Sequence, residues 1–140
     1  MQFVGDGTMA VFGAPIASDD HADRALAAAH AMHQGQEAVN ARWREAGLAP
    51  WGLGIGLTTG EVAAALLGSE ARLEYTLVGD TVNLSQRLQQ WAEPGETVLS
   101  DATYAALTVP PCAELLEPAL VKGRHTPVVC YRVHADGGLG

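Results

Sequence analysis

Residues 73–88 of this 140-residue chain read LEYTLVGDTVNLSQRL, and this stretch decides how the rest of the sequence is interpreted. Its first six residues have the composition of a β-strand. Gly79 and Asp80 then provide a turn and a residue type that caps helix N-termini. Apolar side chains recur after them at helical spacing, at Leu84, Leu88 and Trp91. The stretch therefore predicts a strand that turns directly into an amphipathic helix.

Two polar residues of this helix stand beside its apolar stripe. Asn83 and Arg87 are four residues apart, so they share one face of the helix. Arginine suits the binding of phosphate because it stays charged and presents a planar fork of donors. An isolated pair at this spacing is usually only a solvated helix face. The residues around the pair favour a functional interpretation.

A second motif lies near the start of the chain, where residues 3–15 read FVGDGTMAVFGAP. Two short apolar runs flank Gly-Asp-Gly-Thr, which predicts a β-hairpin with Asp6 at its tip. A carboxylate on a rigid turn is a hard oxygen ligand for a hard cation that bridges phosphate oxygens. Taken alone, Gly-Asp-Gly is more often just a turn.

A third motif occupies residues 51–62, WGLGIGLTTGEV. Alternation over 53–57, a Thr-Thr-Gly break and an apolar run over 62–67 predict a second hairpin. The glycines at 52, 54 and 56 do not have the GxGxxG spacing of a dinucleotide site, and no phosphate-loop motif is present. We interpret these glycines as positions where the backbone packs closely against a neighbour.

The remaining pattern indicates one domain of the α+β class. Helical spacing extends from Ala22 to Gly47 with a weak point near Gly35, and further strands are predicted at 97–99 and 128–133. At 48% apolar side chains the chain can bury one core. We expect a single sheet with helices packed on one face. The domain is assigned to residues 1–135, with 136–140 as a flexible tail.

Charge and composition exclude several classes of partner. Sixteen acidic residues against eight Lys and Arg give a net charge of -8, which disfavours nucleic acid and anionic membranes as ligands. A phosphate-bearing ligand would then need a bound cation. No run reaches the roughly 18 apolar residues of a membrane span. Two distant cysteines, Cys112 and Cys130, do not suggest a disulfide framework. The chain is therefore predicted to be cytoplasmic.

Together and in this order, the three motifs resemble the catalytic domain of class III adenylate/guanylate cyclases, and in particular the soluble bacterial type that contains a threonine. The resemblance implies a ferredoxin-like antiparallel sheet. It implies that Asp6 holds a pair of Mg²⁺ or Mn²⁺ ions, that Asn83 orients the ribose, and that Arg87 meets the negative charge on the α-phosphate. The implied reaction converts ATP into 3′,5′-cyclic AMP and pyrophosphate in cyclic-nucleotide signalling.

Two further positions bear on the base. In the family, the residue at Gln2 is commonly a lysine, and the residue at Thr76 is Asp or Thr in adenylate cyclases. Thr76 fits and Gln2 departs. A glutamine amide has both a donor and an acceptor, so it can pair with adenine or, flipped, with guanine. ATP is favoured and GTP stays open.

The resemblance also implies what surrounds the chain. The other metal-binding aspartate of the family lies on a strand that precedes anything matched here, so we expect an amino-terminally truncated domain that is inactive alone. Family members form their sites between two domains, which implies a homodimer with sites at its interface. The alternative is a degenerate, non-catalytic cyclase domain that dimerises and senses nucleotide as a regulatory module.

Overall fold

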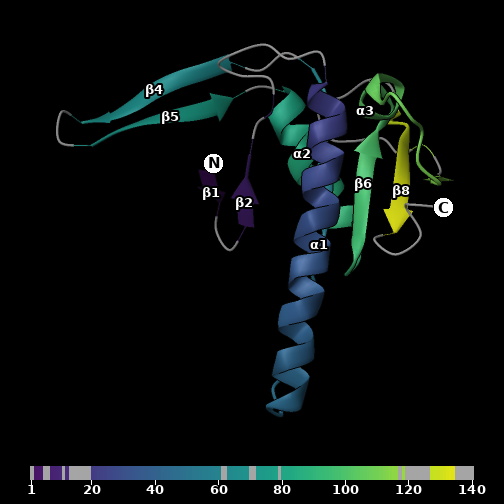
Figure 1. The fold of residues 1–140 in the computed structure, drawn as a ribbon. Helices are drawn as coiled ribbons and strands as arrows, with labels where there is room; N and C mark the ends of the chain where they lie inside the picture. The colour runs from purple at the N-terminus through teal and green to yellow at the C-terminus, as the bar shows by residue number, and fades with distance from the viewer. Residues whose placement is uncertain are drawn as a thin grey trace.

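The computed structural model describes residues 2–4, 7–10, 12, 20–60, 63–69, 72–78, 80–116, 118 and 127–134. For residues 2–4, 7–8, 63–69, 72–78 and 80 it describes the backbone alone. Figure 1 shows how the elements are arranged. In chain order they are β1 (Gln2–Val4), β2 (Gly7–Met9), α1 (His21–Glu45), β3 (Ile55–Leu57), β4 (Ala63–Ser69), β5 (Arg72–Val78), α2 (Asp80–Trp91), β6 (Glu96–Ser100), α3 (Asp101–Ala106), β7 (Glu114–Leu115) and β8 (Cys130–His134).

A four-stranded sheet with the order β3-β6-β8-β7 organises the described structure. β8 pairs antiparallel with both β6 and β7. β3 runs parallel to β6, with Gly56 opposite Val98. The predicted α+β class is confirmed, and the parallel pair makes the sheet mixed where we predicted an antiparallel one. Parallel neighbours need a long crossover, and here β4, β5 and α2 supply it.

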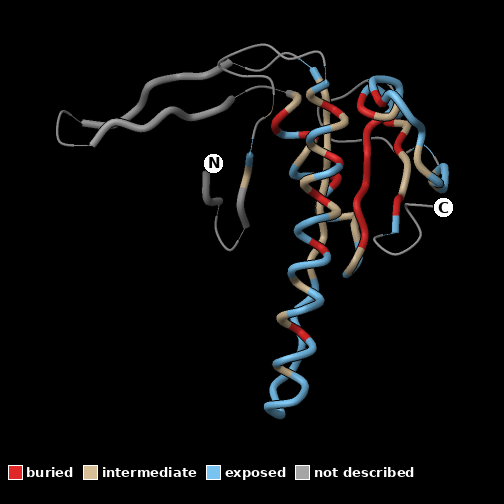
Figure 2. The backbone as a smooth tube through the Cα atoms, in the orientation of Figure 1, coloured by how far each residue is buried: buried red, intermediate tan, exposed pale blue. Residues whose placement is uncertain are grey.

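Helices cover both faces of this sheet. One core cluster joins α1 and the end of α3 to the sheet, and its members are Ala22, Leu26, Leu99, Leu107 and Val133. The other joins α2 to the opposite face, and its members are Leu84, Leu88, Val98, Val128 and Cys130. Successive strand residues point to opposite faces, so every residue of β6 is buried (Figure 2).

The prediction that the helices pack on one face of the sheet is therefore wrong, because α2 packs on the face opposite α1 and α3. The run Thr97-Val98-Leu99 lacks the polar alternation of a half-exposed strand, which is the pattern of a strand covered on both sides. The layers are α1 with α3, the sheet, and α2. Within the described structure, α2, which carries Asn83 and Arg87, is the only helix that packs on its face of the sheet.

α1 is one continuous helix of 25 residues, and it is not interrupted at Gly35, where we predicted a weak point. A Cβ atom at Gly35 would meet nothing within 4 Å, so this glycine lacks only intrinsic helix propensity, about 1 kcal/mol relative to alanine. The helix terminates before Gly47, whose φ of 77° is the left-handed conformation that glycine adopts readily. Among the described residues, no helix is both long enough and apolar enough to cross a membrane.

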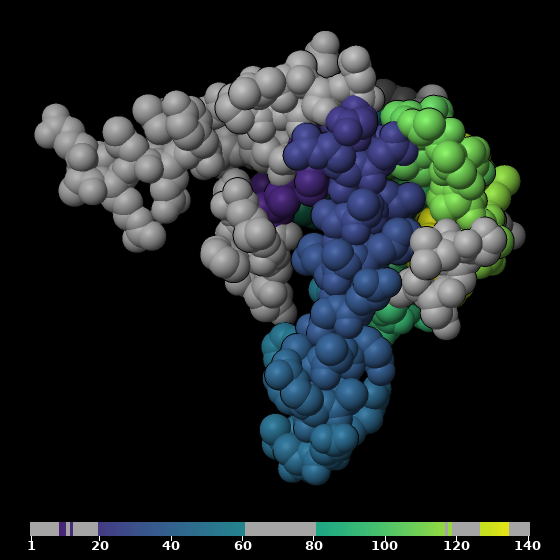
Figure 3. Space-filling view, in the orientation of Figure 1, coloured from purple at the N-terminus to yellow at the C-terminus, as the bar shows by residue number. Residues whose placement is uncertain are grey.

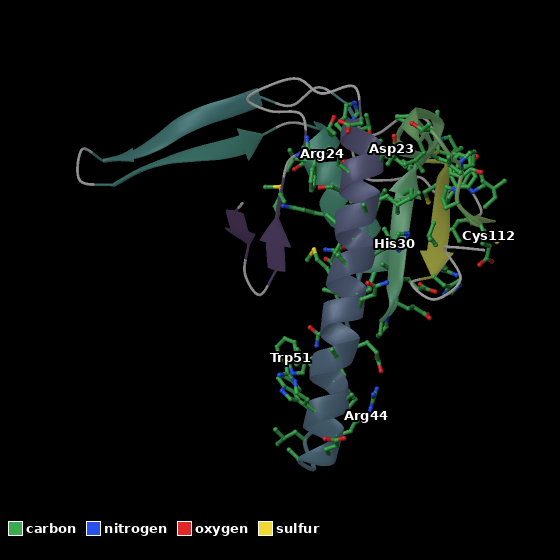
Figure 4. All side chains as sticks on the ribbon, in the orientation of Figure 1. Asp23, Arg24, His30, Arg44, Trp51 and Cys112 are labelled. Atoms are coloured by element: carbon green, nitrogen blue, oxygen red, sulfur yellow. The ribbon has the colours of Figure 1, made fainter. Side chains whose placement is uncertain are left out.

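The second half of α1 extends beyond the sheet and is largely exposed (Figure 2), and with the residues that follow it forms a protruding end in the space-filling view of Figure 3. The chain returns along this half, where Asn40 holds it. The Asn40 side chain donates from Nδ2 to the Trp51 carbonyl oxygen at 2.8 Å and accepts from the Trp51 N–H at 2.9 Å. Figure 4 shows Trp51 beside α1. This pairing ties the chain to α1 four residues before β3 begins.

The two predicted hairpins have different outcomes. β1 and β2 pair antiparallel, with Val4 opposite Gly7, which confirms the first hairpin. The second is wrong: β3 pairs with β6, and β4 pairs instead with β5, from Ala63 opposite Val78 to Ser69 opposite Arg72. β3 and β4 are neighbours in the sequence, but each pairs with a different strand. Closeness in sequence therefore predicted the wrong partner for both.

Candidate active site

α2 divides sharply into a buried and an exposed side. Val82, Leu84 and Leu88 are buried, and the last of them has no exposed surface. Asn83 and Arg87 are exposed one turn apart. The predicted sharing of one helix face is thus confirmed, and apolar contacts with β6 and β8 hold the helix that presents it. Both side chains are available to a ligand or to a second protein surface.

Glycines of the β3 segment let α2 approach closely. A Cβ atom at Gly56 would lie 2.5 Å from both the Ser85 carbonyl oxygen and the Gln89 nitrogen, which are backbone atoms of α2. At Gly54 it would lie 2.7 Å from the Ala92 carbonyl oxygen. The interpretation of these glycines as close-packing positions is confirmed. The contact fixes the distance of α2 from the sheet, and therefore the position of Arg87.

The loop after β3 holds the first turn of the same helix. The Thr58 hydroxyl donates to the Thr81 carbonyl oxygen at 2.9 Å. Gly60 lies against the Thr81 side chain, where a Cβ atom would come 2.6 Å from its hydroxyl oxygen. Thr81 is two residues before Asn83, so the start of α2 is tied to β3 by a hydrogen bond as well as by packing. Both candidate site residues of α2 thus stand on a helix that is held against β3.

The guanidinium of Arg87 is oriented by another side chain of α2. Its Nη1 atom donates to Oε1 of Gln90 at 3.1 Å, and both residues are exposed. Within the described parts of the chain, no carboxylate forms an ion pair with Arg87. Its charge is therefore not neutralised by any described acid and can attract an anion. Gln90 is not among the residues predicted from the sequence, although its i, i+3 spacing from Arg87 is a usable signal.

The structure describes the other predicted site residues only in part or not at all. Asp6 lies outside the described residues. Gln2 is in β1 opposite Met9, and Thr76 is in β5 opposite Ala65, but their side chains lie outside what the structure describes. The structure therefore brings Asn83 and Arg87 together on one helix face, and the roles of all five residues stay predictions. Among the described residues, no group of three His, Cys, Asp or Glu side chains could hold a metal ion.

A buried histidine links α1 to the strand behind the site. His33 is 5% exposed, and its Nε2 lies 3.2 Å from the Glu96 carbonyl oxygen and 3.1 Å from the Thr97 hydroxyl. Burial lowers the pKa of His33, opposed by the hydrogen bond to Glu96 and assisted by the nearby charge of His30. A neutral ring with Nε2 protonated satisfies the carbonyl acceptor. His33 therefore joins layers of the fold.

The Glu96 side chain belongs to the same network. Its carboxylate lies 3.1 Å from Arg132 Nε and 3.5 Å from His134 Nδ1, both on β8, and it accepts from the Glu93 N–H at 2.9 Å. The Arg132 Nε contact lacks hydrogen-bond geometry, so it is an ion pair only. A buried carboxylate with these partners is compensated. The network stabilises the pairing of β6 with β8 next to the core under α2.

Comparisons with known proteins agree with this architecture. Residues 1–135 match the family described as the adenylate and guanylate cyclase catalytic domain. The chain is 33% identical over 139 residues to Adenylate cyclase 1 of Rhizobium meliloti (strain 1021), covering 95% of this chain and 20% of that protein. It thus spans about a fifth of that relative's length.

Two solved structures share the fold. The guanylyl cyclase Cya2 superposes with a TM-score of 0.83 at 35% identity, over 92% of this chain and 64% of that one. The adenylyl cyclase CyaB from P. aeruginosa gives a TM-score of 0.76 at 29% identity, over 92% and 68% of the two chains. The family match, the identity and the fold lead to one conclusion: the chain belongs to the adenylate and guanylate cyclase catalytic domain family.

Proposed function

We propose that this chain is catalytic machinery of a purine-nucleotide cyclase that converts ATP into 3′,5′-cyclic AMP and pyrophosphate. The observation that carries the proposal is the exposed face of α2, where Asn83 and Arg87 stand one turn apart on a helix fixed against the sheet. A cationic fork without a described acidic partner is suited to phosphate oxygens. Cyclic-nucleotide signalling is the role that this activity would serve.

In the proposed reaction, the 3′-hydroxyl oxygen attacks the α-phosphorus and forms a new P–O bond, while the bond from the α-phosphorus to the α,β-bridging oxygen breaks. The bridging oxygen leaves with pyrophosphate, and the hydroxyl proton passes to solvent. Arg87 would donate to α-phosphate oxygens as negative charge builds on them, and Asn83 would orient the ribose through its side-chain amide. Preorganised donors aimed at developing charge are usually the largest single contribution to such catalysis. The close packing of α2 against the sheet supports this assignment.

The proposal includes a pair of divalent ions, which Asp6 would bind. A carboxylate is the hard oxygen ligand that Mg²⁺ and Mn²⁺ prefer. When bound, a pair of such ions would neutralise phosphate charge and lower the pKa of the attacking hydroxyl. The net charge of -8 disfavours a polyanionic substrate, so neutralisation by bound cations would favour its binding. Asp6 itself lies outside the described residues, so its role rests on the motif.

The proposal also includes the substrate and the assembly of the protein. Thr76 favours ATP, while Gln2 is compatible with either purine, and the solved relatives named above include an adenylyl and a guanylyl cyclase. A homodimer would place the Asp6 motif of one copy and Arg87 of the other in the same cleft. Activity would then depend on protein concentration through dimer formation.

The test is product formation by the full-length encoded protein. ATP or GTP is supplied with Mg²⁺ or Mn²⁺, and cyclic nucleotide and pyrophosphate are measured by chromatography with mass detection. Arg87→Ala serves as the inactive variant. Arg42→Ala, which removes another exposed helical arginine, is the matched control. Product from the wild type and from Arg42→Ala, with loss in Arg87→Ala, is expected. No product above the Arg87→Ala level would instead favour the non-catalytic, nucleotide-sensing alternative.

A further inference from the structure

Arg87 is the one charged side chain between residues 81 and 91, so α2 offers a single positive charge to a ligand. A long exposed arginine samples many rotamers, and each must be given up when it meets a phosphate. Here the guanidinium already has one partner, because its Nη1 atom donates to Oε1 of Gln90 at 3.1 Å. This hydrogen bond favours a rotamer in which the side chain lies along the helix before any ligand arrives.

We propose that Gln90 is a positioning residue for Arg87, holding the guanidinium ready for phosphate through its side-chain carbonyl oxygen. The inference rests on the proposed function and deepens it. A guanidinium has five N–H donors in a fixed plane, so one bond to Gln90 orients the plane and leaves four donors for a ligand. Gln90 would act through Arg87 and need not touch the nucleotide.

The chemistry of the acceptor matters as much as its position. A glutamine carbonyl orients a guanidinium without cancelling its charge. A glutamate at position 90 would accept the same bond but would pair with Arg87 as an ion pair, and the field at the phosphate would fall. The described structure thus combines an oriented arginine with an uncompensated charge. This combination is what stabilisation of a developing anion requires.

The matched substitution is Gln90→Met, which keeps side-chain length and helix propensity while removing the acceptor. Gln89→Met is the control, because Gln89 is equally a glutamine exposed on α2 and lies about 200° around the helix from Arg87. We expect Gln90→Met to lower kcat about threefold to tenfold with little change in KM, while Gln89→Met matches the wild type. Melting temperatures are compared throughout.

A third variant, Gln90→Glu, separates positioning from mere structure. We expect its kcat to fall below that of Gln90→Met, because the acceptor remains but the charge is cancelled. Equal kcat in the wild type, Gln90→Met and Gln90→Glu would overturn the inference while leaving the proposed function intact. If the wild type itself makes no cyclic nucleotide, the proposed function fails first. A kcat loss matched by Gln89→Met would assign the effect to the helix and also overturn the inference.

Discussion

Gly56 of β3 lies directly against Ser85 of α2, so close that a Cβ atom at Gly56 would come 2.5 Å from the Ser85 carbonyl oxygen. Real Cβ atoms do not approach backbone oxygens at this distance, so a larger residue must push the helix away. Asn83 and Arg87 stand on that helix. The strand behind the site is thus as important to its geometry as the residues on its face.

Gly56→Ala is expected to destabilise the fold by about 1–3 kcal/mol, because the added methyl group overpacks a backbone contact. Loss of activity should accompany it. Gly35→Ala is the control with the opposite sign, since Gly35 is helical with open space around it and should gain about 0.5–1 kcal/mol. Thermal and urea unfolding measure both. Equal stability of Gly56→Ala and the wild type would contradict the close packing.

Removing the charge of Arg87 should affect the reaction and not the fold. Because the side chain is exposed, Arg87→Ala should change the free energy of unfolding by less than about 0.5 kcal/mol. Activity is expected to fall by about 100-fold or more, since a donor to developing negative charge is lost. Arg87→Lys keeps the charge without the planar fork and should recover only part of the rate. Steady-state kinetics and urea unfolding check the two expectations together.

Asp6→Asn tests the proposed metal ligand. We expect activity to fall by about 100-fold or more, because the amide is a much weaker ligand than the carboxylate. The metal concentration needed for half-maximal activity should rise. Glu45→Gln, which neutralises an exposed acid at the end of α1, should leave both quantities unchanged. A metal titration that is the same for Asp6→Asn and the wild type would remove Asp6 from the site.

The His33 contact predicts a dependence of stability on pH. The folded-state pKa of His33 lies below the ordinary value of 6.5 because the ring is buried. As pH falls below about 6.5, the unfolded chain binds a proton that the folded chain refuses, so the free energy of unfolding decreases until the folded pKa is passed. The groups around the ring are His30, Thr97 and Glu96, and the last carries its charge towards Arg132 and His134.

His33→Gln should remove this part of the pH dependence while keeping a donor for the Glu96 carbonyl oxygen. Urea unfolding between pH 5 and 8 measures it. His21→Gln, on the first turn of α1, is the control and should retain the decrease at low pH. An unchanged pH profile in His33→Gln would show that another group causes the decrease.

The Asn40 contact predicts a local effect. Asn40→Ala removes both hydrogen bonds to the Trp51 backbone and should cost about 1–3 kcal/mol, because two part-buried hydrogen bonds of about 0.5–1.5 kcal/mol each are lost. Amide exchange over residues 48–54 should accelerate. Gln36→Ala removes only the 3.0 Å bond to Asn40 Oδ1 and should have a smaller effect. Similar exchange rates in both variants would indicate that Asn40 does not hold this segment.

Several features of the fold follow from local patterns. The helix over 80–91, the long helix up to Gly47 and the front hairpin were all recognisable, since apolar spacing and turn residues act within a few positions. The partner of β3 was not. Residues 53–57 and 62–67 have hairpin spacing, but β3 gains a buried neighbour in β6, about 40 residues away, and β4 pairs with β5. Local sequence carries little information about which distant strand offers burial.

The sequence by itself determined the family: the motif around Asn83 and Arg87, the Asp6 turn and the glycines around β3 resemble the cyclase catalytic domain, and the family match confirms it. Only the tertiary structure decided where the helix that carries Arg87 lies. Packing against the β3 glycines sets the distance of α2 from the sheet, whereas the contact of Gln90 with the guanidinium lies within the helix. Helical periodicity fixes which side chains share a face, whereas the approach of two backbones depends on contacts between distant segments.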